Sequence, residues 1–334
     1  MKKISTLALI SVLFLVANQT IAQNLIAVQN GNTPRFFQQV DDAIVNAADG
    51  DTLYIPGGSW NLTQRINKRL HLIGVGHNPD STKVTFPTKI NSDFNLYSGA
   101  SNGSITGINI LGGINVQTEL IFYTVKSCRI YYVRIGAKAS NFSFIENVLE
   151  NGVGLYSQVV AANFSYFSNI FGAGAGGGGC TNSIFKNNIF LTNVAANFSL
   201  FENNIFYNNS FYGVGFNENV KNSIAKNNLF VTGLSFENYT NVGSNNLIGQ
   251  PQDGIFVNQS GNTFDYSHDY HLKPDCLGKN AGTDGTDIGI YGGIYPWKEG
   301  SIPSNPHFQS IQIAPKTDTN GNLNVKIKVA AQDH

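Results

Sequence analysis

Short apolar segments recur through the middle of the chain, each bounded by serine and asparagine. Five of them share the order Ser, apolar, apolar, any residue, Asn, and each is followed by further apolar residues. They are residues 143–147, 165–169, 183–187, 199–203 and 223–227, and successive serines are 22, 18, 16 and 24 residues apart. Repeats of this length indicate a solenoid.

The apolar segments are three to five residues long and rich in β-branched and aromatic residues, which is typical of short strands rather than helices. A leucine-rich repeat would require three regularly placed leucines per unit, and this pattern is absent. A parallel β-helix tolerates the uneven spacing because its turns can lengthen or shorten freely. The sequence therefore predicts an all-β, right-handed parallel β-helix, a solenoid with an N-terminal capping helix and a C-terminal β-hairpin.

Asparagine closes each repeated segment. Coils of a β-helix stack about 4.8 Å apart, so amide side chains at one position of successive coils can hydrogen-bond along the stack. Asparagine also tolerates the left-handed backbone of sharp bends. We predict a structural ladder made of Asn147, Asn169, Asn187, Asn203 and Asn227.

Both ends of the rod need a cap. At the N-terminal end, Thr33-Pro34 reads as a helix start, and the apolar spacing predicts a helix over residues 34–48 with Phe37, Val40, Ile44 and Ala47 on one face. Strands are expected at residues 51–55 and 70–73. Alternating segments 308–313 and 323–329 flank Asn320-Gly321 and predict a β-hairpin.

The N-terminus indicates export. Lys2 and Lys3 precede an apolar run at residues 7–17, and Thr20-Ile21-Ala22 provides small residues at a cleavage point. We predict a signal peptide at residues 1–22, a β-helix domain at 23–302 and a linker with the hairpin at 303–334. The apolar run is too short to span a membrane, and no later stretch is long enough.

Composition narrows the function classes. The chain is 42% hydrophobic and 13% charged, with 21 basic and 21 acidic residues. A neutral, charge-poor chain argues against nucleic-acid binding and against disorder. Its 43 asparagines and 35 glycines suit short strands and tight turns. Cys128, Cys180 and Cys276 match no metal motif and read as buried small residues, although one disulfide remains open.

Two segments carry a family resemblance. Residues 37–58 include Gly50-Asp51-Thr52 and Pro56-Gly57-Gly58, and residues 269–282 continue to 287–293. They resemble the opening and the closing coil of secreted right-handed parallel β-helix proteins of the pectin-lyase-like superfamily. The resemblance covers about residues 35–293 and implies the fold. It does not select a function, because the superfamily includes lyases, hydrolases, esterases and non-catalytic surface proteins.

The superfamily's enzymes use carboxylates to bind Ca²⁺ against an acidic sugar, or paired aspartates as acid and base. In this chain no aspartate lies between Asp93 and Asp253, and no histidine between His77 and His268. Glu146 and Glu202 take the same place in their repeats, but intervening coils have other residues there. We therefore expect no metal site and no cofactor, and we read the His268–His271 segment as a terminal turn.

One basic cluster remains. Lys126, Arg129, Arg134 and Lys138 are the catalytic candidates, and the interleaved Tyr123, Tyr131 and Tyr132 are candidates for ligand binding. Together they could bind an acidic polysaccharide, with Lys or Arg as a β-elimination base. A solvated coil face is the favoured alternative. Phe142, Phe164 and Phe198 precede repeat serines and are expected to stack inside the rod.

These observations favour an exported, non-catalytic β-helix that binds glycan or mediates adhesion at the cell surface. The alternative is a polysaccharide lyase, or another carbohydrate-active enzyme, acting on an acidic polysaccharide. A third reading makes the C-terminal hairpin a docking or sorting element. The sequence leaves open the oligomeric state, the ligand and the final location after export, which could be the periplasm, the outer surface or the medium.

Overall fold

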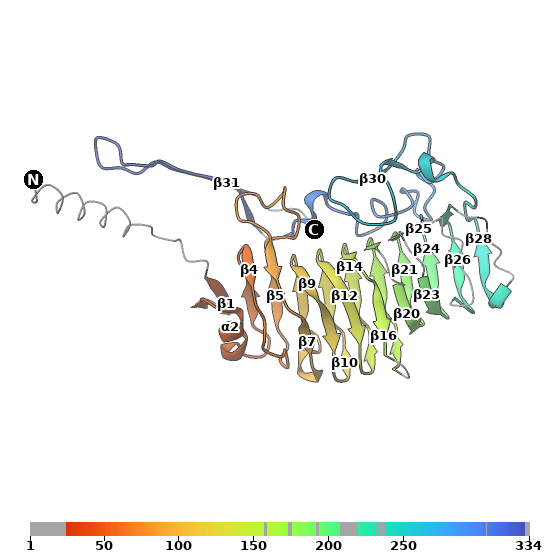
Figure 1. The fold of residues 1–334 in the computed structure, drawn as a ribbon, viewed down its shortest axis with the longest axis horizontal. Coiled ribbons are helices and arrows are strands. Elements are labelled where there is room, and N and C mark those ends of the chain that lie inside the picture. The colour runs from red at the N-terminus through yellow and green to blue at the C-terminus, as the bar shows by residue number, and fades with distance from the viewer. Residues whose placement is uncertain are drawn as a thin grey trace, which may run out of the picture.

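Short strands stack into a rod in the computed structural model, which describes residues 25–156, 159–172, 176–191, 194–207, 220–231, 233, 238–304 and 306–330 (Figure 1). The expected signal peptide at residues 1–22 lies outside the described residues. None of the helices within the described ranges is long and apolar enough to cross a membrane.

Three sheets run along the rod. Sheet A has the order β2 (Thr33–Phe37), β1 (Ile26–Asn30), β3 (Thr52–Tyr54), β5 (His71–Ile73), β8 (Ser104–Thr106), β11 (Thr124–Lys126), β14 (Ser143–Ile145), β18 (Ser165–Phe167), β21 (Ile184–Lys186), β24 (Leu200–Glu202), β26 (Ile224–Lys226) and β28 (Val242–Ser244). Sheet C contains β10 (Leu120–Ile121), β13 (Ala139–Ser140), β17 (Ala161–Ala162), β20 (Gly176–Thr181) and β23 (Val194–Asn197).

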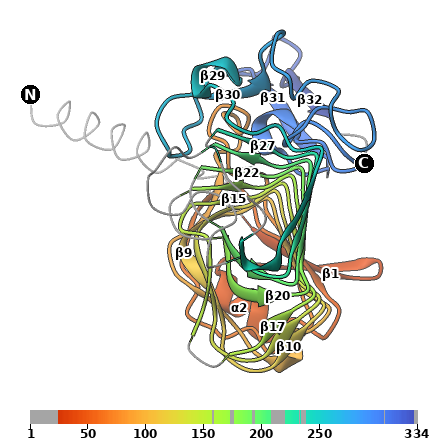
Figure 2. The ribbon, with the colours of Figure 1, turned by 90° about the vertical axis from the view of Figure 1, so that its right-hand side faces the viewer.

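Sheet B lies on the remaining side of the coils. Its order is β27 (Leu229–Phe230), β25 (Ile205–Phe206), β22 (Ile189–Phe190), β19 (Ile170–Phe171), β15 (Val148–Leu149), β12 (Arg129–Ile135), β9 (Asn109–Val116), β6 (Thr88–Ile90) and β4 (Gly58–Trp60), with β16 (Val153–Leu155) paired to β12 and β7 (Phe94–Leu96) to β9. From β3 onward every pairing in the three sheets is parallel. The fold is a parallel β-helix, as the repeats predict, and Figure 2 shows its stacked coils end on.

Aromatic side chains fill the interior in two columns. From sheet A, Phe144, Tyr166, Phe185 and Phe201 stack with ring centroids 4.5 to 5.1 Å apart. From sheet B, Phe171, Phe190, Phe206 and Phe230 stack at 4.4 to 4.8 Å. These distances match the spacing of neighbouring strands, so one ring per coil builds a continuous core.

A buried row of asparagine amides, here the amide row, runs beside this core. In each pair the NH₂ group of one asparagine donates to the amide oxygen of the next coil, at 2.9 to 3.0 Å. The same oxygen accepts a backbone N–H, and the NH₂ group also donates to a backbone carbonyl. The members are Asn147, Asn169, Asn188, Asn204, Asn228 and Asn246.

The predicted ladder therefore has the wrong register in three coils. Asn147 and Asn169 belong to the amide row, whereas Asn187, Asn203 and Asn227 each precede a row member and take a left-handed backbone, with φ between 50° and 58°. Strand pairing aligns Ser165 with Ile184 rather than with Ser183. It also aligns Ile145 with the position of Glu202, so Glu146 and Glu202 do not share a place in the coil. The asparagines of the amide row, rather than the repeat serines, therefore occupy one fixed position in successive coils.

The N-terminal cap differs from the predicted helix over residues 34–48. Residues 33–37 form β2, which pairs antiparallel with β1, and the helix α2 (Val40–Asn46) begins later. Val40, Ile44 and Ala47 are buried as expected, while Phe37 lies in the strand. The Asn30-Gly31 pair is a hairpin signal that the helical pattern obscured, and Pro34 is tolerated because β2 is an edge strand.

The expected closing coil at residues 269–293 is also wrong. After β28 the chain leaves the coils and runs back along the outside of sheet B, where β29 (Phe256–Asn258) and β30 (Asp269–Leu272) pair antiparallel (Figure 1). This segment, residues 248–302, is called the strap. Its apolar side chains, including Phe256 and Ile288, pack on Ile170, Ile189 and Ile205 in a second core outside the coils.

Beyond the strap, β31 (His307–Ile313) and β32 (Val325–Ala330) form the predicted hairpin, which projects from the rod (Figure 1). Short 3₁₀ turns occur at η1 (Ser98–Ala100), η2 (Asn238–Thr240), η3 (Gln252–Gly254) and η4 (Glu299–Ser301). A bulge between Phe308 and Ser310 keeps Phe308, Ile311 and Ile313 opposite Val329, Ile327 and Val325. This apolar face is exposed.

Candidate functional site

The basic and aromatic residues predicted between positions 123 and 138 do not form one site. Lys126 is on sheet A, Arg129 and Arg134 are on sheet B, and Lys138 precedes a strand of sheet C. Tyr123 is buried in the core, so it cannot serve as a surface platform. Coil winding separates residues that are close in sequence. Only Arg129 and Tyr131 line a common cavity among the five principal cavities of the described chain.

Three of the basic members are engaged by acidic or aromatic partners. Arg129 pairs with Glu150, and Lys138 Nζ lies 2.8 Å from Glu119 Oε1. Arg134 lies 4.0 Å above the Tyr132 ring. The Tyr132 hydroxyl in turn donates to Asp93 at 2.8 Å.

These partners oppose a role as a base. Burial disfavours the charge of Arg129, but its hydrogen bond to Tyr266 and its pairing with Glu150 outweigh burial and raise the pKa. The hydrogen bond to Glu119 raises the pKa of Lys138. A β-elimination base must be unprotonated near neutral pH, and both groups stay protonated.

An open groove of about 530 Å³ lies where sheet C turns into sheet A. Its wall is a column of residues, one per coil, each with φ between 52° and 60°. Each backbone N–H in the column donates to the residue that precedes its counterpart in the next coil. The groove is lined by the corner residues Asn141, Asn163, Asn182, Phe198 and Asn222 and by the strand residues Ile184, Leu200 and Ile224.

We call this stack of left-handed residues the corner column. Earlier coils extend it to Phe122 and Asn102. Within the groove the Asn182 amide donates to Asn163 Oδ1 at 2.6 Å. No lining residue of the groove is ionisable, so the groove offers amides, hydroxyls and apolar carbon without net charge.

Phe122 and Phe198 stand out in the corner column. Both have a left-handed backbone, with φ of 53° and 52°, which is costly for a bulky residue. Both side chains also point to solvent, with exposed fractions of 54% and 60%. By contrast Phe142 and Phe164 are buried, and their ring centroids lie 5.0 Å apart. These two side chains stack inside the rod, as the sequence predicts for all three phenylalanines. The prediction is wrong for Phe198.

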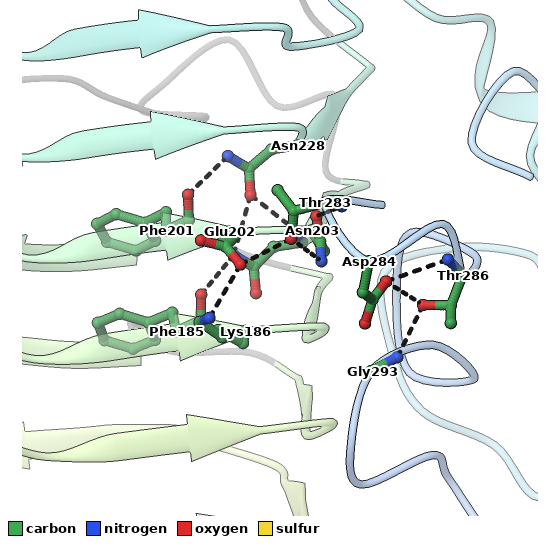
Figure 3. Close-up of polar contacts among 11 residues, drawn as sticks. Phe185, Lys186, Phe201, Glu202, Asn203, Asn228, Thr283, Asp284, Thr286 and Gly293 are labelled. Carbon is green, nitrogen blue, oxygen red and sulfur yellow. Dashed lines mark hydrogen bonds and ion pairs between the residues drawn. The ribbon is translucent and has the colours of Figure 1, made fainter. Parts of the chain in front are cut away.

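A second cavity of about 390 Å³ lies at the other end of the sheet A strands, against the strap, and shares Ile184 with the groove. Lys186 Nζ lies 2.9 Å from Glu202 Oε1, and the Thr283 hydroxyl donates to the same oxygen at 2.8 Å (Figure 3). Asp284 accepts from the Thr286 hydroxyl at 2.6 Å. This charged cavity is lined by two carboxylates, Glu202 from a coil and Asp284 from the strap.

Neither carboxylate suits a general acid. Burial raises the pKa of Glu202, but hydrogen bonds from Lys186 and Thr283 outweigh this effect and lower it. The Thr286 hydrogen bond lowers the pKa of Asp284. A glycosidase acid must hold its proton near neutral pH, which requires a raised pKa. Both groups are therefore anions.

The remaining sequence candidates are structural. His271 Nδ1 lies 2.7 Å from Asp269, and its ring stacks on Tyr291 at 3.8 Å. Among the described residues no group of three or more His, Cys, Asp and Glu side chains could hold a metal ion. The three cysteines are free and buried, and burial raises the pKa of the Cys128 and Cys180 thiols to about 12.

The serine pattern of the sequence hides the groove, because the repeat serines do not occupy one fixed position in the coils. Strand pairing puts Ser183, Ser199 and Ser223 at the inward position that Phe142 and Phe164 occupy in earlier coils. When the coils are compared by the asparagines of the amide row, Phe198 takes the same exposed position as Asn163 and Asn182. Asn141 and Asn163 belong to the same left-handed column.

Comparison with known family models, with curated proteins and with solved structures found no match to this chain.

Proposed function

We propose that this protein is an exported, non-catalytic β-helix that binds a glycan along the corner column and, through this glycan, attaches to the cell surface. The observation that carries the proposal is the pair of exposed phenylalanines, Phe122 and Phe198, held in a left-handed backbone beside a groove. Strained, exposed aromatic residues cluster where a ligand uses them. An aromatic ring offers a face to the C–H side of a sugar, as it does to other flat apolar surfaces.

The rest of the groove supports the same ligand class. Asn141, Asn163 and Asn182 lie between the two phenylalanines, one per coil. Phe122 and Phe198 are therefore four coils apart, which is roughly 19 Å at the spacing of neighbouring strands. Amides both donate and accept, which suits sugar hydroxyls. The absence of ionisable groups from the lining favours a neutral glycan chain over an acidic one.

The alternative function, a polysaccharide lyase acting on an acidic polysaccharide, rests on the basic residues near position 130. It has less support because Arg129 and Lys138 are paired with carboxylates that keep them protonated. We also propose that the chain belongs to the pectin-lyase-like superfamily and that it is exported. They rest on the opening segment and on the pattern of residues 1–22.

The test uses the full chain on immobilised neutral and acidic polysaccharides. We expect retention on at least one neutral polysaccharide, lost in Phe198→Asn and weakened in Phe122→Asn. Phe86→Asn is the matched control, because Phe86 also has a left-handed backbone and 68% exposure but lies away from the groove. Retention that survives both groove variants would overturn the proposal.

Turnover is measured in the same samples by the ultraviolet absorbance of unsaturated sugar products. Absorbance that grows on an acidic polysaccharide and disappears in Arg129→Ala would establish the lyase instead. No turnover together with groove-dependent retention supports the binding function.

A further inference from the structure

A smaller cavity of about 280 Å³ lies on the outer side of sheet B, where the strap passes over the coils. It shares no lining residue with the groove or with the charged cavity. Its walls come from β12, from the turn after β15 and from Thr263 and Phe264 of the strap. Segments more than one hundred residues apart thus build it together.

The floor of this strap cavity is a fixed ion pair. Arg129 Nε donates to Glu150 Oε1, and each side chain is 28% exposed. The guanidinium faces two strap rings, at 5.6 Å from the Phe264 centroid and 4.9 Å from the Tyr266 centroid. The Tyr266 hydroxyl donates to the His77 carbonyl at 2.9 Å. Arg129 is therefore held in place from three sides before any ligand arrives.

Tyr131 supplies an open aromatic wall. The register between β12 and β9 shifts between Ile130 and Tyr132, so Tyr131 lies opposite a β-bulge formed by Leu111 and Gly112 of β9. The Tyr131 side chain is 49% exposed. Its ring also contacts that of Tyr132 edge-on, at 5.8 Å and 65°. The Tyr131 backbone carbonyl accepts the N–H of Asn151 at 2.9 Å, which ties Tyr131 to the next coil.

The chemistry of the cavity selects its ligand. The charge of Arg129 is already matched by Glu150, so an added anion would meet a neighbouring carboxylate. An apolar ligand would remove water from a charged pair without replacing its hydrogen bonds, which is costly. A ligand with hydroxyl groups on one edge and a C–H face on the other satisfies both the ion pair and the tyrosine ring.

We propose that the strap cavity is a binding site for a neutral saccharide unit, separate from the corner column. Its volume is at the low end for small-molecule sites, which fits one or two sugar rings. Sugar hydroxyls donate to Glu150 and accept from Arg129, while a sugar face packs on Tyr131. The site goes beyond the proposed groove function and shares no residue with it, so either can fail without the other.

The test is ligand-observed NMR on the full chain with the methyl glycosides of glucose, galactose, mannose and N-acetylglucosamine, and with galacturonic acid as the charged probe. We expect at least one neutral glycoside to bind in the millimolar range. Tyr131→Ala and Glu150→Gln should each weaken binding about five- to tenfold, since an aromatic contact or a hydrogen bond to a charged group contributes about 1 to 1.5 kcal/mol.

Two controls separate the sites. Phe198→Asn removes the groove platform and should leave glycoside binding at the strap cavity unchanged. Tyr54→Ala removes another partly exposed tyrosine, on β3, and should also have no effect. Because the Tyr131 side chain is half exposed, Tyr131→Ala should fold even if Glu150→Gln does not.

Three results would overturn the proposal: no neutral glycoside binds, binding survives Tyr131→Ala, or galacturonic acid binds more tightly than every neutral glycoside. Loss of binding in Phe198→Asn would also overturn it, because the sugar would then occupy the groove.

Discussion

Asparagine forms two rows along the same coils, and their surroundings are opposite. In the amide row Asn147, Asn169 and Asn188 are buried and fully hydrogen-bonded between coils. In the corner column Asn163 and Asn182 are exposed, and their left-handed backbone is what the turn requires. The same residue type is thus used once for its amide and once for its backbone.

The difference separates stability from binding. A buried amide that loses its partners leaves unpaired polar groups inside the protein, which is costly. An exposed amide exchanges its partners with water at little cost, so it is available for a ligand. Substitutions in the amide row should therefore affect folding, and substitutions in the corner column should affect binding.

The largest effect is expected at Asn169. Asn169→Ala leaves the backbone N–H of Asn147 and the carbonyl of Phe144 without the amide that pairs with them. At roughly 1 to 3 kcal/mol for each unpaired buried group, the free energy of unfolding should fall by about 3 kcal/mol. Denaturant unfolding measures this change.

Asn182→Gly is the matched control, because glycine keeps the left-handed backbone and removes only the exposed amide. Its unfolding free energy should change by less than about 0.5 kcal/mol. Equal losses in the two variants would break the distinction between the rows.

The next effect extends the comparison to a titratable group. His77 is buried, its Nε2 has no hydrogen-bond partner, and burial, helped by the charge of Arg129, lowers its pKa to about 3. The unfolded chain takes up a proton near pH 6.5 and the folded chain does not. The stability contribution of neutral His77 is therefore complete above pH 6.5 and lost as the pH falls towards 3.

At pH 4.5, two pH units below 6.5, this loss should be roughly 2 to 3 kcal/mol, because each unit contributes about 1.4 kcal/mol. Thermal unfolding between pH 7 and pH 4 should show the decline, and His77→Gln should reduce its slope. A slope that His77→Gln does not change would contradict the prediction.

The smallest effect is expected in the corner column. Phe198→Asn places a residue that tolerates the left-handed backbone where phenylalanine is strained, so unfolding should become more difficult by about 1 kcal/mol while glycan retention falls. The reverse change, Asn163→Phe, should lower stability by a similar amount. Denaturant unfolding of both variants checks the pair, and a loss of stability in Phe198→Asn would show that the ring packs rather than binds.

The sequence predicted the coils better than it predicted their surface. Repeated apolar segments place Phe144, Tyr166 and Phe185 inside because one ring per coil matches the strand spacing. The candidate site fared worse. Lys126, Arg134 and Lys138 are close in sequence but face different sides of the rod. Lys126 is on sheet A, Arg134 is on sheet B and Lys138 precedes a strand of sheet C, because a single coil passes through all three sheets.

Local pattern alone thus determined the solenoid, its inward apolar positions and the terminal hairpin, since each depends on residues a few positions apart. Only the tertiary structure decided which outward-facing apolar residues of the coils are covered by the strap. Ile170 and Phe171 look alike in sequence and both are buried, yet Phe171 faces the interior and Ile170 faces the strap. That choice depends on contacts between residues about a hundred positions apart, and no local periodicity encodes them.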